Sequence, residues 1–199
     1  MTIIKQQAIY RISQSKWNNF MGKITDKEFL RQGIEWGISA ENQAFMQLAM
    51  GAMQQIQGLP VKTVLDYGAG VGAYAESARK LGYDVFAYDI WESCRGYMKQ
   101  YFPELKQCDE PITTDLLVMI EVAEHMTDIE VHNLFSQIQP TFILFSGCNT
   151  STVNDEYWGH VNIKQPEEWH EFLKRYGYQV REKVPTPTDH TFIYELKQC

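Results

Sequence analysis

Three short stretches of this 199-residue chain contain residues whose types and spacing could do chemistry. In the first, Gly68, Gly70 and Gly72 alternate, starting two residues after Asp66. Glycine lets the backbone approach a ligand closely, and the amide groups that begin a following helix can bind the ligand's polar atoms. Asp89, about 20 residues further on, has the spacing of a carboxylate that accepts hydrogen bonds from ribose hydroxyls. This stretch therefore predicts a nucleotide-like ligand.

Two classes of ligand fit the glycines alone. Gly68-x-Gly70-x-x-Ala73 also satisfies the dinucleotide fingerprint, whose third position can be Gly or Ala. Asp66 favours a ligand with positive charge near the turn, because its carboxylate would repel a pyrophosphate there. The alternative for Asp66 is a structural cap on the amides of the turn. For Asp89 the alternative is an acidic residue that only ends a strand.

The second stretch, Glu121-Val-Ala-Glu124-His125, follows a fully apolar run. Two carboxylates and an imidazole are suitable ligands for a divalent cation, with His160 as a candidate fourth ligand. Such an ion would lower the pKa of an acceptor hydroxyl and position it. The alternative is that these residues line an acceptor pocket or pack the end of a strand. We favour the alternative, name Glu124 and His125 as candidate catalytic residues, and predict no metal.

The third stretch, residues 154–162, is irregular and contains aromatic and amide side chains. His160 is the candidate general base, because an unperturbed histidine has a pKa of ~6.5 and can accept a proton at neutral pH. The alternative for His160 is a hydrogen bond that pins the loop. Tyr157, Trp158 and Asn162 are candidate substrate contacts.

An alternation of strands and helices must position these stretches. Apolar runs predict strands at 61–65, 83–88, 105–108, 116–120 and 141–145, and helical periodicity predicts helices at 73–80, 91–101 and 127–138. This alternation is typical of a mostly parallel sheet, in which ligands bind beyond the carboxyl ends of the strands. Asp66, Asp89 and Glu121 fall at such ends. Two closing strands, 178–184 and 191–196, lack a helix between them and should pair as an antiparallel hairpin at the sheet edge.

Residues 1–38 are predicted to form a helical cap or lid on a main domain at 39–199. Capping-box patterns, in which Ser or Thr is followed three residues later by Glu, predict helix starts at Thr25 and Thr127. The first of these helices should run through Leu30. Ser39 is expected to cap the next helix, which continues to residue 57. The apolar face and the aromatic residues of the cap would come from Tyr10, Trp17, Phe20, Met21, Ile24 and Trp36.

Composition excludes several classes of protein. The hydrophobic content of 44% and charged content of 22% are those of a soluble globular chain. The net charge of −7 argues against broad binding to nucleic-acid phosphates. Four scattered cysteines indicate reduced thiols rather than disulfides or a zinc site. We find neither a signal-peptide pattern nor the ~20 apolar residues that a membrane span needs. We expect a cytoplasmic protein without membrane contact, and leave a homodimer open.

The run Val-Leu-Asp66-Tyr-Gly68-Ala-Gly70-Val-Gly72, with Asp89 and the Glu121 to His125 stretch, resembles the class I S-adenosylmethionine-dependent methyltransferases. The resemblance covers roughly residues 39–196. It implies an α/β, Rossmann-like fold: a seven-stranded, mostly parallel sheet of order 3-2-1-4-5-7-6, with strand 7 antiparallel. Helices on both faces of the sheet and an N-terminal helical extension complete the expected fold.

The resemblance also implies residue roles. The glycine turn would face the methionine part of the cofactor, Asp89 its ribose and Asp109 its adenine, and Glu121 with Val122 would lie beside the reactive methyl. The full set of implied cofactor-binding residues is Asp66, Gly68, Ala69, Gly70, Asp89, Ile90, Asp109, Glu121 and Val122. In the small-RNA 2′-O-methyltransferases and the ubiquinone-pathway O-methyltransferases, a similar Glu-x-x-Glu-His stretch holds a divalent metal. Many class I enzymes carry similar residues without one.

The function that this resemblance implies is methyl transfer from S-adenosylmethionine to an oxygen or nitrogen of a small-molecule or sugar-like acceptor, with S-adenosylhomocysteine as product. In-line displacement of the methyl group does not always need a base, so the reaction does not strictly require a catalytic residue. The alternatives are an RNA methyltransferase, an NAD-dependent oxidoreductase and a non-catalytic cofactor-binding subunit. Asp66 and the Glu121 to His125 stretch argue against the oxidoreductase, and the acidic charge balance argues against RNA.

Overall fold

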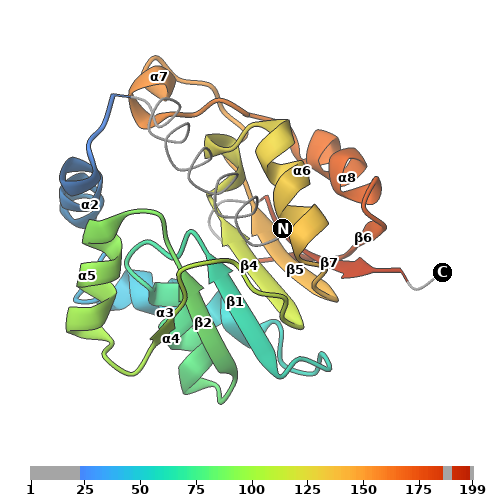
Figure 1. Ribbon diagram of the computed structural model, residues 1–199, viewed down its shortest axis with the longest axis horizontal. Helices are drawn as coiled ribbons and strands as arrows, with labels where there is room; N and C mark the ends of the chain where they lie inside the picture. The colour runs from blue at the N-terminus through green and yellow to red at the C-terminus, as the bar shows by residue number, and fades with distance from the viewer. Residues whose placement is uncertain (1–22, 186–189, 198–199) are drawn as a thin grey trace, which may run out of the picture.

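A computed structural model describes residues 23–185 and 190–197, so the predictions on Tyr10, Trp17, Phe20 and Met21 lie outside the described residues. The chain forms one seven-stranded sheet of order β3-β2-β1-β4-β5-β7-β6 (Figure 1). The first five strands pair in parallel, and β7 is antiparallel to both β5 and β6. The predicted fold class, strand order and edge hairpin are confirmed. The strands are β1 (Thr63–Tyr67), β2 (Asp84–Tyr88), β3 (Lys106–Gln107), β4 (Leu116–Ile120), β5 (Phe142–Ser146), β6 (Tyr178–Val184) and β7 (Thr191–Leu196).

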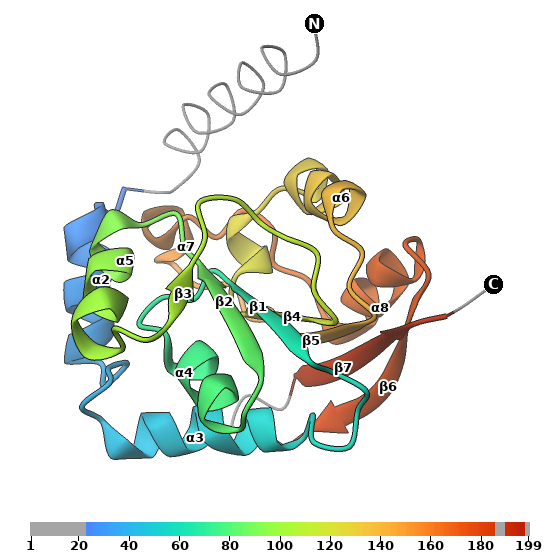
Figure 2. The ribbon, with the colours of Figure 1, turned by 60° about the horizontal axis from the view of Figure 1, so that its bottom comes forward.

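Helices cover both faces of the sheet, with α3 and α4 on one side and α6 on the other (Figure 2). The helices are α2 (Asp26–Glu35), α3 (Gln43–Gln54), α4 (Ala73–Lys80), α5 (Glu92–Tyr101), α6 (Asp128–Gln137), α7 (Asp155–Trp158) and α8 (Pro166–Lys174). A short 3-10 helix, Ala123–His125, follows β4. In the described part of the chain, no helix has both the length and the apolar character to cross a membrane.

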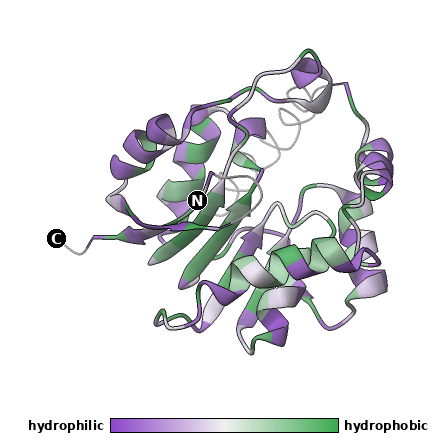
Figure 3. Ribbon diagram, turned by 180° about the vertical axis from the view of Figure 1, so that it is seen from behind, coloured by the Kyte–Doolittle hydropathy of each residue, from purple (hydrophilic) through white to green (hydrophobic). Residues whose placement is uncertain are grey.

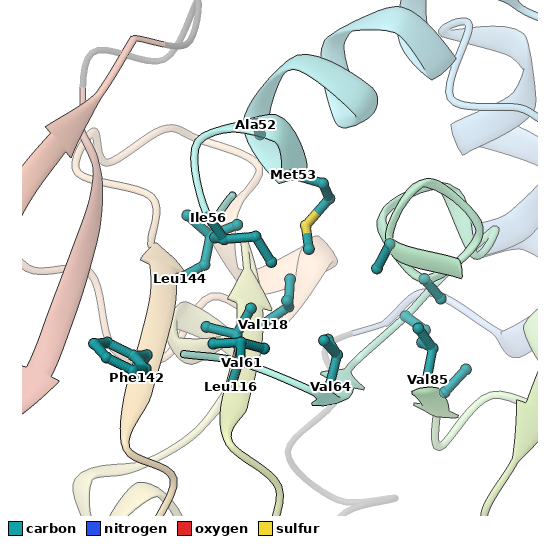
Figure 4. Packing of buried hydrophobic residues seen from close by; sticks show 14 of the residues in the cluster. Ala52, Met53, Ile56, Val61, Val64, Val85, Leu116, Val118, Phe142 and Leu144 are labelled. Carbon is teal, nitrogen blue, oxygen red and sulfur yellow. The ribbon is translucent and has the colours of Figure 1, made fainter. Parts of the chain in front are cut away.

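Alternation along the central strands creates two cores. Because successive side chains of a strand point to opposite faces, Val64 and Val118 pack under α3 and α4, whereas Leu65 and Met119 pack under α6 and α8. Figure 4 shows Met53 and Ile56 of α3 directed at the first of these faces. In Figure 3 the central strands are hydrophobic along most of their length, which is expected of parallel strands buried on both faces.

Three helix and strand ends differ from the predictions. The side chain of Asn42 caps α3 by accepting from the amides of Ala44 (3.1 Å) and Phe45 (3.4 Å), so the prediction of Ser39 as the cap is wrong. α2 begins at Asp26 as expected, but it continues past Leu30 to Glu35 and makes no capping bond to the Thr25 side chain. β1 extends to Tyr67, because its pairing with β2 continues beyond Leu65.

Two other predictions about local structure have different outcomes. The capping box at Thr127 is confirmed: the Thr127 amide donates to Glu130 Oε2 (2.7 Å), and the Glu130 amide donates to Thr127 Oγ1 (3.3 Å). The loop after β5, predicted to be irregular, contains the single helical turn α7. A four-residue helix has too few positions for sequence periodicity to show it.

Candidate functional site

The glycine turn after β1 meets the end of β4. Gly68 has a φ of +74°, and a Cβ added to it would lie 2.6 Å from Val122 Cγ2. Only glycine fits at this point, because both the backbone conformation and the contact exclude a side chain. A Cβ at Gly70 (φ +54°) would meet no atom within 4 Å, so the turn faces open space there. The strand order reverses between β1 and β4, which is where ligands of α/β sheets bind.

Asp89, directly after β2, binds the glycine turn through hydrogen bonds. Its Oδ2 accepts from the amide of Gly70 (2.7 Å) and its Oδ1 from the amide of Trp91 (2.7 Å). Burial raises the pKa of Asp89 to about 6, although these two amides oppose the shift. Arg95 Nη1 donates to the carbonyls of Asp89 (2.7 Å) and Ile90 (2.9 Å) and so holds this segment. Each carboxylate oxygen has two acceptor sites, so Asp89 retains capacity for a ligand hydroxyl.

Asp66 is buried inside β1, with 3% of its surface exposed. Its Oδ2 accepts from the amide of Ala75 (2.9 Å) in the first turn of α4, which is the capping role considered as its alternative. Burial raises the pKa of Asp66 to about 7, and the nearby charge of Asp89 adds to the shift. A cation bound near Asp66 would favour its ionised form. Contact between Asp66 and a cofactor stays a prediction.

Asp109 follows β3, the outermost strand on this side of the sheet. Its side chain is exposed. The amide of the preceding residue, Cys108, donates to the carbonyl of Ala87 (3.0 Å) in β2, so the segment stays beside the Asp89 end of the sheet. The predicted role of Asp109 near the adenine stays a prediction.

Glu121, the first residue after β4, has a left-handed backbone conformation with a φ of +54°. No other non-glycine residue in the described segments has a positive φ. Its Oε1 accepts from Ser146 Oγ (2.6 Å) and lies 3.3 Å from His190 Nε2. Strained backbone of this kind persists where surrounding contacts enforce it, and it clusters at functional sites.

Glu124 lies in the 3-10 turn after β4 and is 1% exposed. Its Oε2 is buried and has no hydrogen-bond partner within the described part of the chain. Burial, with the adjacent Glu121 carboxylate, raises the pKa of Glu124 well above its usual range. The carbonyl of Glu124 accepts from the amides of Val161 (2.8 Å) and Asn162 (3.0 Å), which attaches the loop after β5 to this turn.

His125 and His160 complete a cluster with Glu124. One ligand atom from each of the three residues lies within 4.8 Å of the other two, and the two imidazole rings are 4.8 Å apart. Burial lowers the pKa of His125 to about 4, with His160 adding to the shift and the carbonyl of Trp158 partly opposing it. His125 is therefore neutral at neutral pH, and neutral imidazole is the form that binds metals.

Asp155 orients His160. His160 Nδ1 lies 3.2 Å from Asp155 Oδ1. Hydrogen bonds, chiefly from the Ser151 hydroxyl, lower the pKa of Asp155 to about 2, so this carboxylate is ionised. An ionised carboxylate only accepts, which places the proton of His160 on Nδ1 and leaves the lone pair on Nε2.

The three predicted substrate contacts connect segments of the fold. The hydroxyl of Tyr157 accepts from Gln32 Nε2 (2.9 Å) in α2. The ring of Trp158 lies 4.8 Å from the ring of Trp36. Asn162 Nδ2 donates to Asp128 Oδ1 (3.0 Å) at the start of α6. All three side chains therefore hold the loop after β5 in place, and their contact with a substrate stays a prediction.

Helix α2 bridges the two sides of the site, between α5 and α7 (Figure 1). The Asp26 carboxylate accepts from the amide of Ser93 (3.1 Å) in the first turn of α5. The ring of Phe29 stacks on Trp91 (5.7 Å) and also meets Trp158 edge-on (5.9 Å). The part of the predicted cap from Asp26 to Trp36 is thus packed beside both the Asp89 segment and the loop after β5. Its movement as a lid stays a prediction.

Sequence reasoning missed Ser146 and His190. Ser146 ends β5, and His190 directly precedes β7. Because β7 is antiparallel to β5, with Phe192 opposite Phe145, the start of β7 lies at the edge where the parallel strands end. The expected hairpin could have placed His190 at the site, since the start of an antiparallel strand shares an edge with the carboxyl ends of its neighbours.

Comparisons with known proteins agree with this geometry. A family model described as a methyltransferase domain matches residues 41–146, which is more than half of the chain. A search of curated proteins found no match. Magnesium protoporphyrin IX methyltransferase from Synechocystis PCC 6803, solved with bound SAH, is 17% identical with a TM-score of 0.60, and the match covers 98% of both chains.

Two larger proteins share the fold. Human N-acetylserotonin methyltransferase, solved with SAM, is 15% identical with a TM-score of 0.62, and the match covers 88% of this chain and 57% of that one. The pyocyanin biosynthetic protein PhzM is 13% identical with a TM-score of 0.59, and the match covers 78% and 56%. This chain thus spans little more than half of the length of these two proteins. On the family match and the shared fold, the chain belongs to the methyltransferase domain family.

Proposed function

We propose that the protein binds S-adenosylmethionine at the glycine turn and transfers its methyl group to an oxygen or nitrogen of a small-molecule acceptor. One observation carries the proposal: Asp89 binds the Gly70 amide beside the open space above the turn, at the reversal of strand order. Two of the similar solved structures bind SAM or SAH, and their names specify small-molecule acceptors. The acidic net charge of −7 supports such an acceptor over RNA.

The donor side of the site would be formed by the ends of β1 and β2. Bound S-adenosylmethionine supplies an electrophilic methyl group on a sulfonium ion. The glycine turn, Gly68 to Gly70 with Ala69, would hold the methionine part, and Asp66 would favour the adjacent positive charge. Asp89 and Ile90 would hold the ribose, and Asp109 would lie near the adenine.

The acceptor side would be formed by the end of β4 and the loop after β5. Glu121 and Val122 would lie beside the methyl, since Val122 touches the glycine turn. His160 is one candidate to accept the acceptor's proton, through Nε2, with Asp155 stabilising the imidazolium. Tyr157, Trp158 and Asn162 would shape the entrance, and the α2 bridge would exclude water. We place the protein in the cytoplasm, and light scattering would establish whether it forms a homodimer.

A divalent cation is a second proposal, and the orphaned Glu124 oxygen favours it. Glu124, His125 and His160 supply one oxygen and two nitrogen donors within 4.8 Å of one another. An ion there would give the unpartnered Oε2 a ligand and stabilise the ionised form of a carboxyl whose pKa burial raises. Such an ion would lower the pKa of an acceptor hydroxyl. The sequence prediction favoured no metal, and the unpartnered Glu124 oxygen is the reason for this different proposal.

Isothermal titration calorimetry with Mn²⁺ and Zn²⁺ tests the cation site directly. We expect binding with a stoichiometry near one that is lost in His125→Ala. The control is His132→Ala, because His132 is exposed on α6 and contacts Tyr176 instead. Binding that is equal in both variants would place the ion elsewhere.

The methyltransferase proposal is tested by calorimetry with S-adenosylmethionine, S-adenosylhomocysteine and NAD. A second experiment is an activity assay, which measures the transfer of a tritiated methyl group from S-adenosylmethionine to a panel of phenols, catechols, amines and a short RNA. We expect micromolar binding of the first two ligands and transfer to a small molecule. Tight binding of NAD alone would indicate the oxidoreductase. Transfer only to RNA, with strong salt dependence, would indicate the RNA enzyme. Cofactor binding without transfer would indicate a non-catalytic subunit.

A further inference from the structure

A second imidazole–carboxylate pair lies at the end of β4, apart from His160 and Asp155. His190 Nε2 is 3.3 Å from Glu121 Oε1, and the same oxygen accepts from Ser146 Oγ at 2.6 Å. The three residues come from three separate strand ends and are brought together only by the fold. His190 belongs to neither the Glu124, His125 and His160 cluster nor the cofactor-binding residues.

Glu121 is held in one position by its surroundings. Its backbone amide donates to the carbonyl of Ser146 (3.2 Å), and the Ser146 side chain is completely buried. The left-handed conformation of Glu121 is strained in a residue that is not glycine. A strained residue whose carboxylate is also fixed by a buried serine is a preorganised hydrogen-bond acceptor.

The fixed carboxylate determines which nitrogen of His190 carries the proton. A carboxylate oxygen accepts hydrogen bonds, so an ionised Glu121 would take its hydrogen bond from Nε2–H and leave the lone pair on Nδ1. The His190 side chain is 15% exposed and Glu121 is 40% exposed, so the pair remains reachable from outside the core. A carboxylate that orients a histidine in this way also stabilises the imidazolium once a proton is accepted.

The pair stands close to the glycine turn. Val122, the next residue after Glu121, would touch a Cβ at Gly68, so the end of β4 forms the wall opposite that turn. Phe192 pairs with Phe145, which brings His190 beside the end of β5 on the same edge. The glycine turn, Glu121 and His190 therefore lie along the same edge of the sheet.

We propose that His190, oriented by Glu121, is the proton acceptor for a hydroxyl acceptor in the transfer reaction; this rests on the proposed function. The acceptor oxygen forms a bond to the methyl carbon while the carbon–sulfur bond breaks, and the electron pair of that bond stays on sulfur. The hydroxyl proton passes to Nδ1 of His190, and the imidazolium releases it to water after the product leaves.

His190 and His160 differ in whether they belong to the candidate cation cluster. One ring nitrogen of His160 lies in the cluster with Glu124 and His125, so a cation bound there would use it as a ligand. His190 lies outside that cluster and keeps its lone pair whether or not an ion is bound. The two histidines can thus serve one site, with His160 as ligand and His190 as base.

The test compares His190→Ala and His190→Gln with His132→Ala, which changes an exposed histidine on α6. The probes are S-adenosylhomocysteine in calorimetry and tritiated S-adenosylmethionine with the best hydroxyl acceptor of the panel. We expect kcat to fall by about 100-fold in both His190 variants, the usual scale for loss of a general base. The affinity for S-adenosylhomocysteine should stay within about twofold, because the proposal leaves cofactor binding unchanged. Added imidazole should restore the rate of His190→Ala but not of His190→Gln, because the glutamine side chain still fills the space that the imidazole would occupy.

A kcat within twofold of wild type in His190→Ala, or a lost rate that imidazole does not restore, overturns the proposal. If the wild-type protein binds the cofactor but methylates no hydroxyl, the proposed transfer to oxygen has failed. In that case ¹⁵N NMR of the histidines tests the contact between His190 and Glu121 independently of the reaction. A proton on Nε2 of His190 in the S-adenosylhomocysteine complex, with that preference lost in Glu121→Ala, supports the pair. A proton on Nδ1 overturns it.

Discussion

The region after β1 and β2 and the region after β4 and β5 both collect acidic residues at one edge of the sheet, but they are built differently. In the first, the acids bind amides 2 to 19 positions away, within one βαβ unit: Asp66 binds Ala75, and Asp89 binds Gly70 and Trp91. In the second, Glu121 contacts Ser146 and His190, which are 25 and 69 positions away and belong to other strand ends.

The two regions also differ in how completely their polar groups are satisfied. Both carboxylate oxygens of Asp89 have hydrogen bonds, whereas Glu124 has a buried oxygen without a partner among the described residues. Buried polar atoms in folded proteins are nearly always paired, and the unpartnered Glu124 oxygen is the observation behind the proposed cation. The proposed donor region thus has its hydrogen bonds formed already, whereas the proposed acceptor region has one that is left unformed among the described residues.

The largest effect should come from a substitution in the preorganised region, Gly68→Ala. Its Cβ would lie 2.6 Å from Val122 in a left-handed backbone conformation, so the turn must move away from β4. We expect affinity for S-adenosylmethionine to fall by at least about 100-fold, or roughly 3 kcal/mol. Calorimetry measures this, and Gly51→Ala in α3, where a Cβ meets nothing, is the matched control. Near-normal affinity in Gly68→Ala would show that the turn does not hold the cofactor.

Asp89→Ala should have the next largest effect. The variant loses the bonds to Gly70 and Trp91 together with the proposed ribose contact, so affinity should weaken by about 1–3 kcal/mol. Asp84→Ala is the control, because Asp84 begins the same strand and its carboxylate pairs with exposed Lys106. An unchanged dissociation constant in Asp89→Ala would remove the predicted role.

A smaller effect should appear in the pH dependence of the free energy of unfolding, through the ionisation of Asp66. Its pKa is about 7 in the folded protein against 3.8 for an ordinary aspartate, so the folded state binds more protons between those values. The free energy of unfolding should therefore fall as pH rises from 4 to 7, by on the order of 2 kcal/mol. Asp66→Asn should reduce this slope in urea unfolding by that amount, while the raised pKa values of Asp89 and Glu124 maintain the remainder. An unchanged slope in the variant would assign it entirely to other groups.

The same variant separates the two roles of Asp66. An asparagine Oδ1 can still accept from Ala75, so a purely capping residue should tolerate the change. If Asp66 also faces the cofactor's positive charge, affinity for S-adenosylmethionine should drop while the protein remains at least as stable at pH 8. Equal affinity in the wild-type protein and in Asp66→Asn would show that Asp66 only caps α4.

The smallest effect should come from Phe29→Ala in α2, which connects the two regions. The loss of its ring contacts with Trp91 and Trp158 should cost about 1 kcal/mol. If α2 acts as a lid, S-adenosylhomocysteine should dissociate about fivefold faster, which stopped-flow tryptophan fluorescence measures. Arg31→Ala on the exposed face of α2 is the control, since within the described residues the Arg31 guanidinium forms its ion pairs with Glu28 and Glu35 of the same helix. Equal dissociation rates would show that α2 is only a structural bridge.

Much of the fold could be predicted from the sequence, because its determinants are local. The apolar run of β4, the capping box at Thr127 and the helix-free connection between β6 and β7 are all confirmed. Errors arose where several local choices compete. Ser39 and Asn42 are both good N-caps, and the helix begins after the one whose side chain reaches its free amides.

The sequence by itself determined the donor region, since the glycines, Asp66 and Asp89 lie within one βαβ unit whose geometry follows from their spacing. Only the tertiary structure decided the acceptor region. The positive φ of Glu121 depends on Ser146, the position of His190 depends on the antiparallel pairing of β7, and Tyr157 and Trp158 pack on α2. These contacts join residues from about 25 to 125 positions apart. At such separations the pairing is chosen by the packing of whole elements, which no local pattern of residues encodes.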